Sequence, residues 1–371
     1  MKICHLTSVH PYMDTRIFIK ECRSLSEIKG FSVHFVAPDA PTTKKDGVNI
    51  HGVKKEAGGR FNRMRKTTKN VLHKALEIDA DVYHFHDPEL IPIGLKLKKK
   101  RKKVIYDIHE DVPRQILSKH WIPKPLRRMI SFSFERYENK AVKNFDGLVT
   151  ATPFINKRFE RLHSNAININ NFPLLDELHL PHVDWEKKEK SVCYVGGLVK
   201  NRGIYEMVEA LNHTDTQMLL AGTFGNTKDY EEVQQKSSWN KVHYLGFLDR
   251  DGVKNTFQKS MAGLVVLHPT MNYIDALPVK MFEYMAAGLP VIASDFSLWK
   301  EIIESNNCGI CVDPLKPEEI GKAIQWLVDH PEEAKQMGEN GRRAVEEKYN
   351  WEKESEKLLS LYKKLEKELQ K

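Results

Sequence analysis

The stretch "DALPVKMFEYMAAGLPVIASD", residues Asp275 to Asp295, joins a short apolar helix to a buried strand. Pro278 suits the first turn of that helix and Gly288 suits its end, because proline favours helix starts and glycine favours helix stops. The segment "PVIASD" follows as the strand. A helix that leads directly into a buried strand is typical of a parallel sheet covered by helices.

The same alternation of strands and helices runs through the chain. The expected strands of the first half lie in "KICHLT", "FSVHFVAP", "ADVYHFHD", "KVIYDIHE" and "DGLVTATP". Those of the second half lie in "SVCYVGGL", "QMLLAGTF", "KVHYLGFL", "AGLVVLHP", "PVIASD" and "GICVDP". The proline-containing segment "NFPLLDELHLPHVDWEKKEK" separates the two runs. The pattern predicts two α/β domains with parallel sheets, residues 1–172 and 191–349, joined by a linker at 173–190 and followed by a helix at 350–371 that packs back on the first domain.

The length and composition of the chain are consistent with two domains. The chain has 371 residues, 41% of them hydrophobic, which is enough for two domain cores. No apolar run approaches the roughly 20 residues of a membrane-spanning helix, and "MKICHLTSVHP" lacks a secretory signal, so a cytoplasmic protein is expected. The five cysteines are an odd number spread over the chain and do not indicate a disulfide framework. The "CGIC" of Cys308 to Cys311 lacks a second such pair, which favours buried packing over a redox or zinc site.

Charge is divided unequally between the two halves. Residues 1–180 carry 33 lysines and arginines against 20 aspartates and glutamates, a net +13, whereas residues 181–371 carry 25 against 30, a net −5. The basic segments are "RFNRMRKTTK", "KLKKKRKK" and "WIPKPLRRMISF". The last one mixes cations with aromatic and apolar residues from Trp121 to Phe132, which suits an anionic membrane surface.

Ligands of parallel α/β sheets bind beyond the carboxyl ends of the strands. The helix that begins near Pro278 follows such a strand end, and its free N–H groups favour an anion. Glu283 lies in this otherwise apolar helix, so its carboxylate needs hydrogen-bond donors. The two neighbouring hydroxyl groups of a ribose offer two such hydrogen-bond donors. An ion pair with Lys280, three residues earlier, is the alternative.

The second half then resembles the nucleotide-sugar domain of the retaining glycosyltransferases of family 4. The resemblance rests on "YVGGLVKNRGIYEMVEAL", "LLAGTF", "VHYLGFL", the stretch from Leu267 to Asp295, and "NNCGICVDP". Weaker matches in the first half are "DTRIFIKE", "DVYHFHD" and "YDIHED". The resemblance implies the GT-B fold, in which two Rossmann-like domains with parallel sheets face a central cleft.

The resemblance also implies roles for particular residues. Glu283 takes the second position of the family's Glu-x7-Glu motif, which binds the donor ribose, and Asp275 takes the first position, beside the donor sugar. The family's diphosphate-binding arginine and lysine are replaced by Gly197 and Arg202, with Lys200 or Lys280 supplying the missing cation. The implied catalytic set is therefore His109, Arg202 and Asp275, and the implied donor-binding set is Glu283, Lys280, Arg202, Leu248, Val279 and Gly197. Asp14 and Arg16 stand where the family has a glycine-rich loop and are the acceptor-side candidates.

The activity implied by the resemblance is transfer of a sugar from a UDP- or GDP-sugar, with retention, to a glycan or polyprenyl-linked acceptor at the inner face of the plasma membrane. No cofactor is expected. No metal is expected either, because His84 and His86 alternate with Phe85 and no third ligand is evident at a sensible spacing. A nucleotide-sugar 2-epimerase is the alternative of the same fold; it needs acid and base carboxylates around the sugar. A basic nucleic-acid binder accounts for the +13 charge and leaves Glu283 unexplained.

Overall fold

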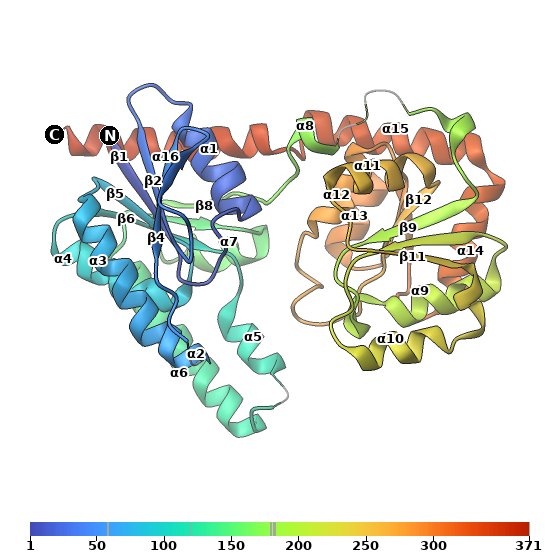
Figure 1. Cartoon of the computed structure of the whole chain (residues 1–371), viewed down its shortest axis with the longest axis horizontal. Coiled ribbons are helices and arrows are strands. Elements are labelled where there is room, and N and C mark those ends of the chain that lie inside the picture. The colour runs from blue at the N-terminus through green and yellow to red at the C-terminus, as the bar shows by residue number, and fades with distance from the viewer. Residues whose placement is uncertain (58, 120, 179, 181–182, 371) are drawn as a thin grey trace. The chain divides into compact units, whose positions relative to one another are not determined.

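The computed structural model describes residues 1–57, 59–119, 121–178, 180 and 183–370. The chain divides into two compact units. The first unit is Met1–Asn171 together with Lys353–Lys371, and the second unit is Phe172–Glu352. Each consists of one sheet covered by helices (Figure 1). Within the predicted linker 173–190, residues 179, 181 and 182 lie outside the described residues, as does residue 371 of the predicted final helix.

The first unit contains an eight-stranded sheet with the order β3-β4-β2-β1-β5-β6-β7-β8. Its strands are β1 (Lys2–Leu6), β2 (Ser32–Pro38), β3 (Thr43–Lys45), β4 (Val48–Val53), β5 (Val82–Phe85), β6 (Lys103–Ile108), β7 (Gly147–Thr150) and β8 (Ala166–Asn168). Neighbouring strands are parallel except β3, which pairs antiparallel with β4. The five strands predicted for this half are confirmed as β1, β2, β5, β6 and β7.

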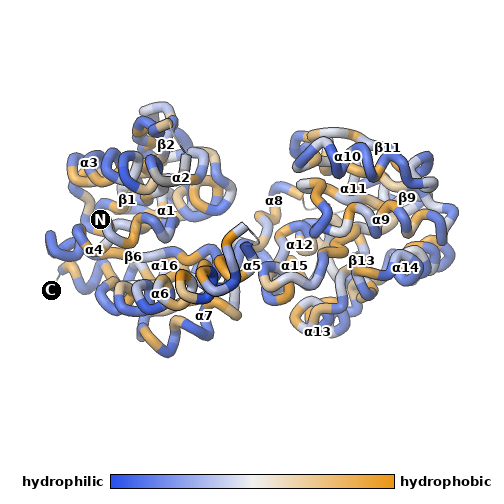
Figure 2. The backbone as a smooth tube through the Cα atoms, turned by 90° about the horizontal axis from the view of Figure 1, so that it is seen from below, coloured by the Kyte–Doolittle hydropathy of each residue, from blue (hydrophilic) through white to orange (hydrophobic). Residues whose placement is uncertain are grey.

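The helices of the first unit cover both faces of its sheet (Figure 1). They are η1 (Thr15–Cys22, a π-helix), α1 (Arg23–Ser26), α2 (Gly59–Asn62), η2 (Arg63–Thr67), α3 (Thr68–Ile78), η3 (Pro88–Leu90), α4 (Ile91–Lys99), α5 (Val112–Ser118), α6 (Lys124–Val142), α7 (Pro153–Phe159) and most of α16 (Trp351–Leu369). Along their length the helices alternate between hydrophobic and hydrophilic residues, as helices with one buried face do (Figure 2). Among the described residues, no helix combines the length and the apolar composition needed to cross a membrane.

The second unit contains a six-stranded, all-parallel sheet with the order β11-β10-β9-β12-β13-β14. Its strands are β9 (Ser191–Val195), β10 (Gln217–Ala221), β11 (Val242–Gly246), β12 (Ala262–Val265), β13 (Val291–Ser294) and β14 (Gly309–Val312). Each strand predicted for this half is confirmed. The helices are α8 (Leu175–Leu178), η4 (Trp185–Lys187), η5 (Lys200–Arg202), α9 (Ile204–Ala210), η6 (Leu211–His213), α10 (Thr227–Gln234), η7 (Ser237–Lys241), α11 (Arg250–Lys259), α12 (Val279–Ala286), α13 (Ser297–Ser305), α14 (Pro317–Asp329) and α15 (Pro331–Glu347).

Helix α12 is fixed against the middle of this sheet by close packing. A β-carbon on Gly263 of β12 would lie 2.3 Å from Cγ of Tyr284, so a glycine is needed at this position for the tyrosine ring to pack against the sheet. The Tyr284 hydroxyl accepts a hydrogen bond of 3.0 Å from the backbone N–H of Val195, at the end of β9. Because α12 is anchored in this way, its first turn is held near the residues that follow β9.

Candidate active site

Two cationic side chains lie over the turn that follows β9. Gly196 has φ +146°, and a β-carbon at this position would lie 2.5 Å from Nζ of Lys280. A β-carbon on Gly197 would lie 3.0 Å from Nη1 of Arg202. The absence of side chains at both glycines therefore lets an ammonium and a guanidinium approach the same stretch of backbone. Gly197, Arg202 and Lys280, three of the residues expected to bind the donor diphosphate, are brought together here.

Lys280 is buried without a hydrogen-bond partner. Its Nζ makes no hydrogen bond to any described residue and lies 3.7 Å from the centroid of the Tyr194 ring. Burial and the nearby positive charge of Arg202 lower the pKa of this amine to about 7, against the opposing effect of Glu283. A buried amine without an acceptor is costly, and an anionic ligand would remove that cost by accepting its hydrogen bonds.

Two tyrosines that no local sequence pattern indicates lie beside the Arg202 side chain. The hydroxyls of Tyr273 and Tyr194 interact with its guanidinium and, against the effect of burial, raise its pKa. The Tyr194 hydroxyl in turn donates to the backbone carbonyl of Gly197 over 3.1 Å. Burial raises the pKa of Tyr194 to about 12, so this hydroxyl keeps its proton at neutral pH. The planar guanidinium is thereby oriented before any ligand arrives, which suits a bidentate phosphate contact.

The first turn of α12 adds backbone donors to these two cations. The helix begins at Val279, and no side chain of the described residues caps it, since Pro278 occupies the N-cap position. N–H groups in the first turn of a helix have no partner within the helix and favour negative charge. Because Lys280 belongs to the same turn, the backbone dipole and the buried amine act on one place. The expected helix start near Pro278 is confirmed.

Glu283 lies one turn further along α12 and pairs with Arg250. Its side chain is 15% exposed, and its Oε1 accepts a hydrogen bond of 2.9 Å from Nη1 of Arg250. Nη2 of the same arginine donates to Glu177 over 2.7 Å. The predicted alternative was an ion pair between Glu283 and Lys280. Among the described residues, the cation that pairs with Glu283 is Arg250 instead. Arg250 follows β11, and its position just beyond a strand end was the only signal of its role.

Leu248 and Asp275 are two further candidates for the donor site. Leu248 is partly buried and packs against the core that contains α12, so its side chain helps to support the end of β11. Asp275 lies half-buried in the segment between β12 and α12. Its carboxylate has no hydrogen bond or ion pair with any residue that the structure describes.

The candidates of the first unit surround the buried carboxylate of Asp107. Arg16 donates to both of its oxygens, through Nε and Nη2, at 3.0 Å each. His109 lies 2.9 Å from Oδ2 through Nε2, and its side chain is 17% exposed. Burial alone would raise the pKa of Asp107, but Arg16 and His109 outweigh it and hold the pKa well below its usual range. Asp107 thus fixes the orientation of His109.

Asp14 and Arg16 are engaged within the first unit. Oδ1 of Asp14 accepts from the backbone N–H groups of Arg16 and Ile17, both at 2.9 Å, and so caps the start of η1. Its other oxygen lies 3.1 Å from Nδ1 of His10. Besides Asp107, the buried Arg16 donates to the Ile169 carbonyl over 2.9 Å. Both side chains therefore position the residues after β1, and an acceptor contact at either one stays a prediction.

The low pKa of Lys280 predicts that donor binding depends on pH. Near pH 7 the amine of the unliganded protein is about half protonated, and a diphosphate binds the protonated form. Affinity for UDP should fall as the pH rises from 7 to 9, by up to about tenfold per pH unit. Calorimetric titration at several pH values measures this slope. Neighbouring Tyr194 and Cys193 do not interfere, since burial raises both of their pKa values to about 12.

The matched variant for this experiment is Lys280→Met, which keeps an apolar chain of similar length over the Tyr194 ring. It should bind UDP more weakly, with an affinity that no longer changes between pH 7 and 9. A wild-type affinity that is flat over this range would show that Lys280 does not meet the diphosphate.

Comparisons with known proteins find relatives for both halves of the chain. Residues 177–344 match the family "Glycosyl transferases group 1", and residues 17–169 match "Glycosyltransferase Family 4". An uncharacterized glycosyltransferase of Methanocaldococcus jannaschii is 27% identical over 200 residues, which is 49% of this chain and 50% of that protein, so the chain aligns with half the length of this relative. D-rhamnosyltransferase WbpZ of Pseudomonas aeruginosa is 23% identical over 272 residues, 72% of this chain and 69% of that protein.

A solved structure shows the same fold. HepE of Anabaena in complex with UDP is similar with a TM-score of 0.75 at 13% identity, covering 98% of this chain and 100% of that chain. The two family matches together with the two parallel sheets identify the chain: it belongs to the family 4, group 1 glycosyltransferases and has the GT-B fold.

Proposed function

We propose that this glycosyltransferase moves a hexosyl or N-acetylhexosaminyl group from a UDP- or GDP-sugar to a glycan or polyprenyl-linked acceptor, with retention at the anomeric carbon. The observation that carries the proposal is the pairing of the buried, unpartnered Lys280 amine with the oriented Arg202 guanidinium at the start of α12. Such a set of fixed donors suits a diphosphate. The UDP bound to HepE, a protein of the same fold, supports the nucleotide part of the proposal.

The proposed chemistry is electrostatic. As the bond between sugar and diphosphate breaks, negative charge grows on the leaving group, and Arg202, Lys280 and the N–H groups of the first turn of α12 stabilise that charge. In this proposal the leaving diphosphate takes the acceptor proton on the front face, as the family resemblance implies. His109 and Asp275 hold the donor sugar, and Glu283 accepts hydrogen bonds from the ribose. No metal takes part in the transfer.

Product analysis tests the reaction type. The protein is incubated with a panel of UDP- and GDP-sugars and candidate glycan acceptors, and the anomeric configuration of the product is assigned by proton NMR. An α-linked donor should give an α-linked product. A β-linked product would contradict retention, and the absence of transfer or donor hydrolysis with every donor would contradict the proposed function.

The proposed acceptor side includes attachment to an anionic membrane surface through α6 and the residues just before it. This surface exposes several large apolar side chains, with Trp121 at 77%, Met129 at 58% and Phe132 at 60%, accompanied by Leu126, Ile130 and Tyr137. Arg128 and Lys140 are exposed on the same helix, and Arg136 lies 5.4 Å from the Phe132 ring centroid. The buried residues of α6 are Ser131, Glu138, Ala141 and Val142, so the exposed apolar side chains are not part of the core.

We expect binding to liposomes that requires anionic lipid and weakens with salt. Each cation near an anionic surface contributes about 1 kcal/mol, so changing Arg128 and Arg136 to Gln should lower binding roughly tenfold or more. Sedimentation with liposomes measures this. Lys228→Gln, at an exposed lysine of α10, is the matched control and should bind like the wild type. Equal sedimentation with neutral liposomes, or no sedimentation with either kind, would contradict attachment of α6 to an anionic membrane.

A further inference from the structure

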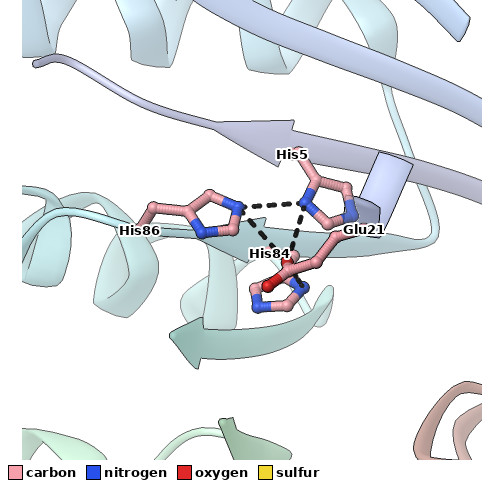
Figure 3. Close-up of side chains that lie close together, drawn as sticks. All are labelled: His5, Glu21, His84 and His86. Carbon is pink, nitrogen blue, oxygen red and sulfur yellow. Dashed lines mark hydrogen bonds and ion pairs between the residues drawn. The ribbon is translucent and has the colours of Figure 1, made fainter. Parts of the chain in front are cut away.

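Four buried side chains in the first unit face one another without an apolar neighbour between them: His5, Glu21, His84 and His86 (Figure 3). His5 of β1 and His84 of β5 are register partners in adjacent parallel strands, so their side chains share one face of the sheet. His86 comes directly after β5 and two residues after His84, so its side chain returns to that face. Glu21 reaches the group from η1. All four side chains are completely or almost completely excluded from solvent.

The potential ligand atoms of these four residues lie close together. Nδ1 of His5 lies 3.0 Å from Nε2 of His86. Oε2 of Glu21 lies 3.9 Å from His5 Nδ1 and 4.0 Å from both His84 Nδ1 and His86 Nε2. All four atoms lie within 4.8 Å of one another. A tetrahedral zinc ion with bonds of about 2.0–2.1 Å places its ligand atoms about 3.3 Å apart, so the three distances from Glu21 would have to shorten by about 0.6–0.7 Å to complete the shell.

The buried Glu21 carboxylate pairs with Arg16, a cation that it shares with Asp107. Neither of its oxygens has a hydrogen-bond partner among the described residues, although the side chain is fully buried. Its Oε1 lies 3.1 Å from Nε of Arg16, but the single hydrogen on that nitrogen is donated to Asp107. Because the guanidinium is shared, Oε2 has no hydrogen-bond donor among the described residues, and a cation bound at that oxygen would lower the cost of burying the carboxylate. Nε2 of His84 is a second buried polar atom without a partner.

The surrounding residues have the arrangement found around metal-binding histidines. A metal-bound imidazole usually donates its other N–H to an oxygen, which fixes the ring and its tautomer. His86, with Nε2 toward the centre, has Nδ1 3.2 Å from Asp107 Oδ2. His5, with Nδ1 toward the centre, has Nε2 3.2 Å from the hydroxyl of Tyr362. Two of the three imidazoles are thus oriented by oxygen atoms in the manner of a zinc site. The third, His84, has Nδ1 2.9 Å from the Tyr362 hydroxyl, a hydrogen bond that this nitrogen would exchange for the bond to zinc.

We propose that His5, Glu21, His84 and His86 bind one divalent zinc ion that stabilises the first unit. Three imidazole nitrogens and one carboxylate oxygen are ligands that zinc accepts in tetrahedral geometry, and a closed set of four protein ligands is typical of a structural rather than a catalytic site. The ion would join β1, η1 and β5. The ligands belong to the first unit and the proposed diphosphate contacts to the second, so the zinc proposal and the proposed transferase activity can fail independently.

The test is metal analysis of the full-length protein. Because the site is buried, the chain is unfolded in chelator, refolded with zinc or cobalt(II), and freed of loosely held metal by gel filtration. We expect one zinc per chain, and we expect the refolded cobalt form to show the strong visible absorption of tetrahedral coordination. Zinc should also raise the melting temperature of the refolded protein compared with protein refolded in chelator.

Two variants decide whether these four residues hold the ion. Glu21→Gln should lose the stoichiometric zinc and the cobalt absorption. His51→Gln is the matched control, because His51 and His34 form another histidine pair, with nitrogens 2.9 Å apart, that belongs to no cluster of metal-ligand type among the described residues. It should retain one zinc per chain. The cobalt titration of the wild type needs no variant, so it remains decisive if Glu21→Gln fails to fold. Wild-type protein that refolds without tetrahedral cobalt or retained zinc would overturn the proposal, leaving a hydrogen-bonded histidine cluster.

Discussion

Replacing Arg202 by alanine should lower kcat by about 10²–10³-fold, the usual cost of removing one fixed donor that faces charge growing in the transition state. The guanidinium is oriented by Tyr194 and Tyr273 before ligand binds, so its stabilisation is available at the moment the bond breaks. The KM for the donor should change much less. Steady-state kinetics with the best donor of the panel gives both constants.

Lys200→Ala is the matched control for Arg202. Lys200 lies in the same short helix, η5, but its exposed ammonium points to the Tyr205 ring, 5.6 Å from the centroid. This variant should keep kcat within a few-fold of the wild type. If Arg202→Ala raised the KM for the donor and left kcat unchanged, Arg202 would bind the ground state of the diphosphate and would not stabilise the transition state.

The second large effect is expected for Glu283→Gln, which should weaken binding of the donor nucleotide about ten- to a hundredfold. The amide keeps the shape of the side chain but loses the charge that accepts two ribose hydrogen bonds, and a hydrogen bond to a charged group contributes about 1.5–3 kcal/mol. Arg250 retains its contact with Glu177, so the local fold should persist. Calorimetric titration with UDP and GDP measures the loss, and circular dichroism checks the fold.

Glu177→Gln separates the ribose contact from the ion pair. It removes the other partner of Arg250 and leaves Glu283 intact, so nucleotide affinity should stay near the wild-type value. An unchanged affinity in Glu283→Gln, or an equal loss in both variants, would mean that Glu283 only anchors Arg250.

The parts of the fold that the sequence predicts are those with strong local periodicity. Each central strand was recognisable because its apolar residues are continuous and are bounded by turn residues. The strands that the pattern missed are β3, β4 and β8. β3 consists of the exposed residues "TKK", and β8 has three half-buried residues, so neither carries an apolar signal. β4 alternates buried with half-buried positions and lies between predicted segments.

The candidate site was predictable where one short segment contains the chemistry. Val279, Lys280 and Glu283 share α12, so their proximity follows from helical spacing. The contacts of Arg250 with Glu283, and of Tyr273 with Arg202, join residues far apart in the sequence, and no local pattern indicates them. The same reason hid the histidine cluster. His84 and His86 looked like a pair without a third ligand until the order of the strands placed β1 beside β5 and brought in His5.

Titration of the wild-type protein with UDP and with GDP, beside the double variant Arg202→Ala/Glu283→Gln, tests the central claim most directly. The claim is that the cations over the Gly196–Gly197 turn and the carboxylate of α12 together form a site for a nucleoside diphosphate. We expect at least one of the two nucleotides to bind the wild type at one site per chain, and the double variant to lose this binding while it keeps its fold. Failure of both nucleotides to bind the wild type, or equal binding to the folded double variant, would contradict the account.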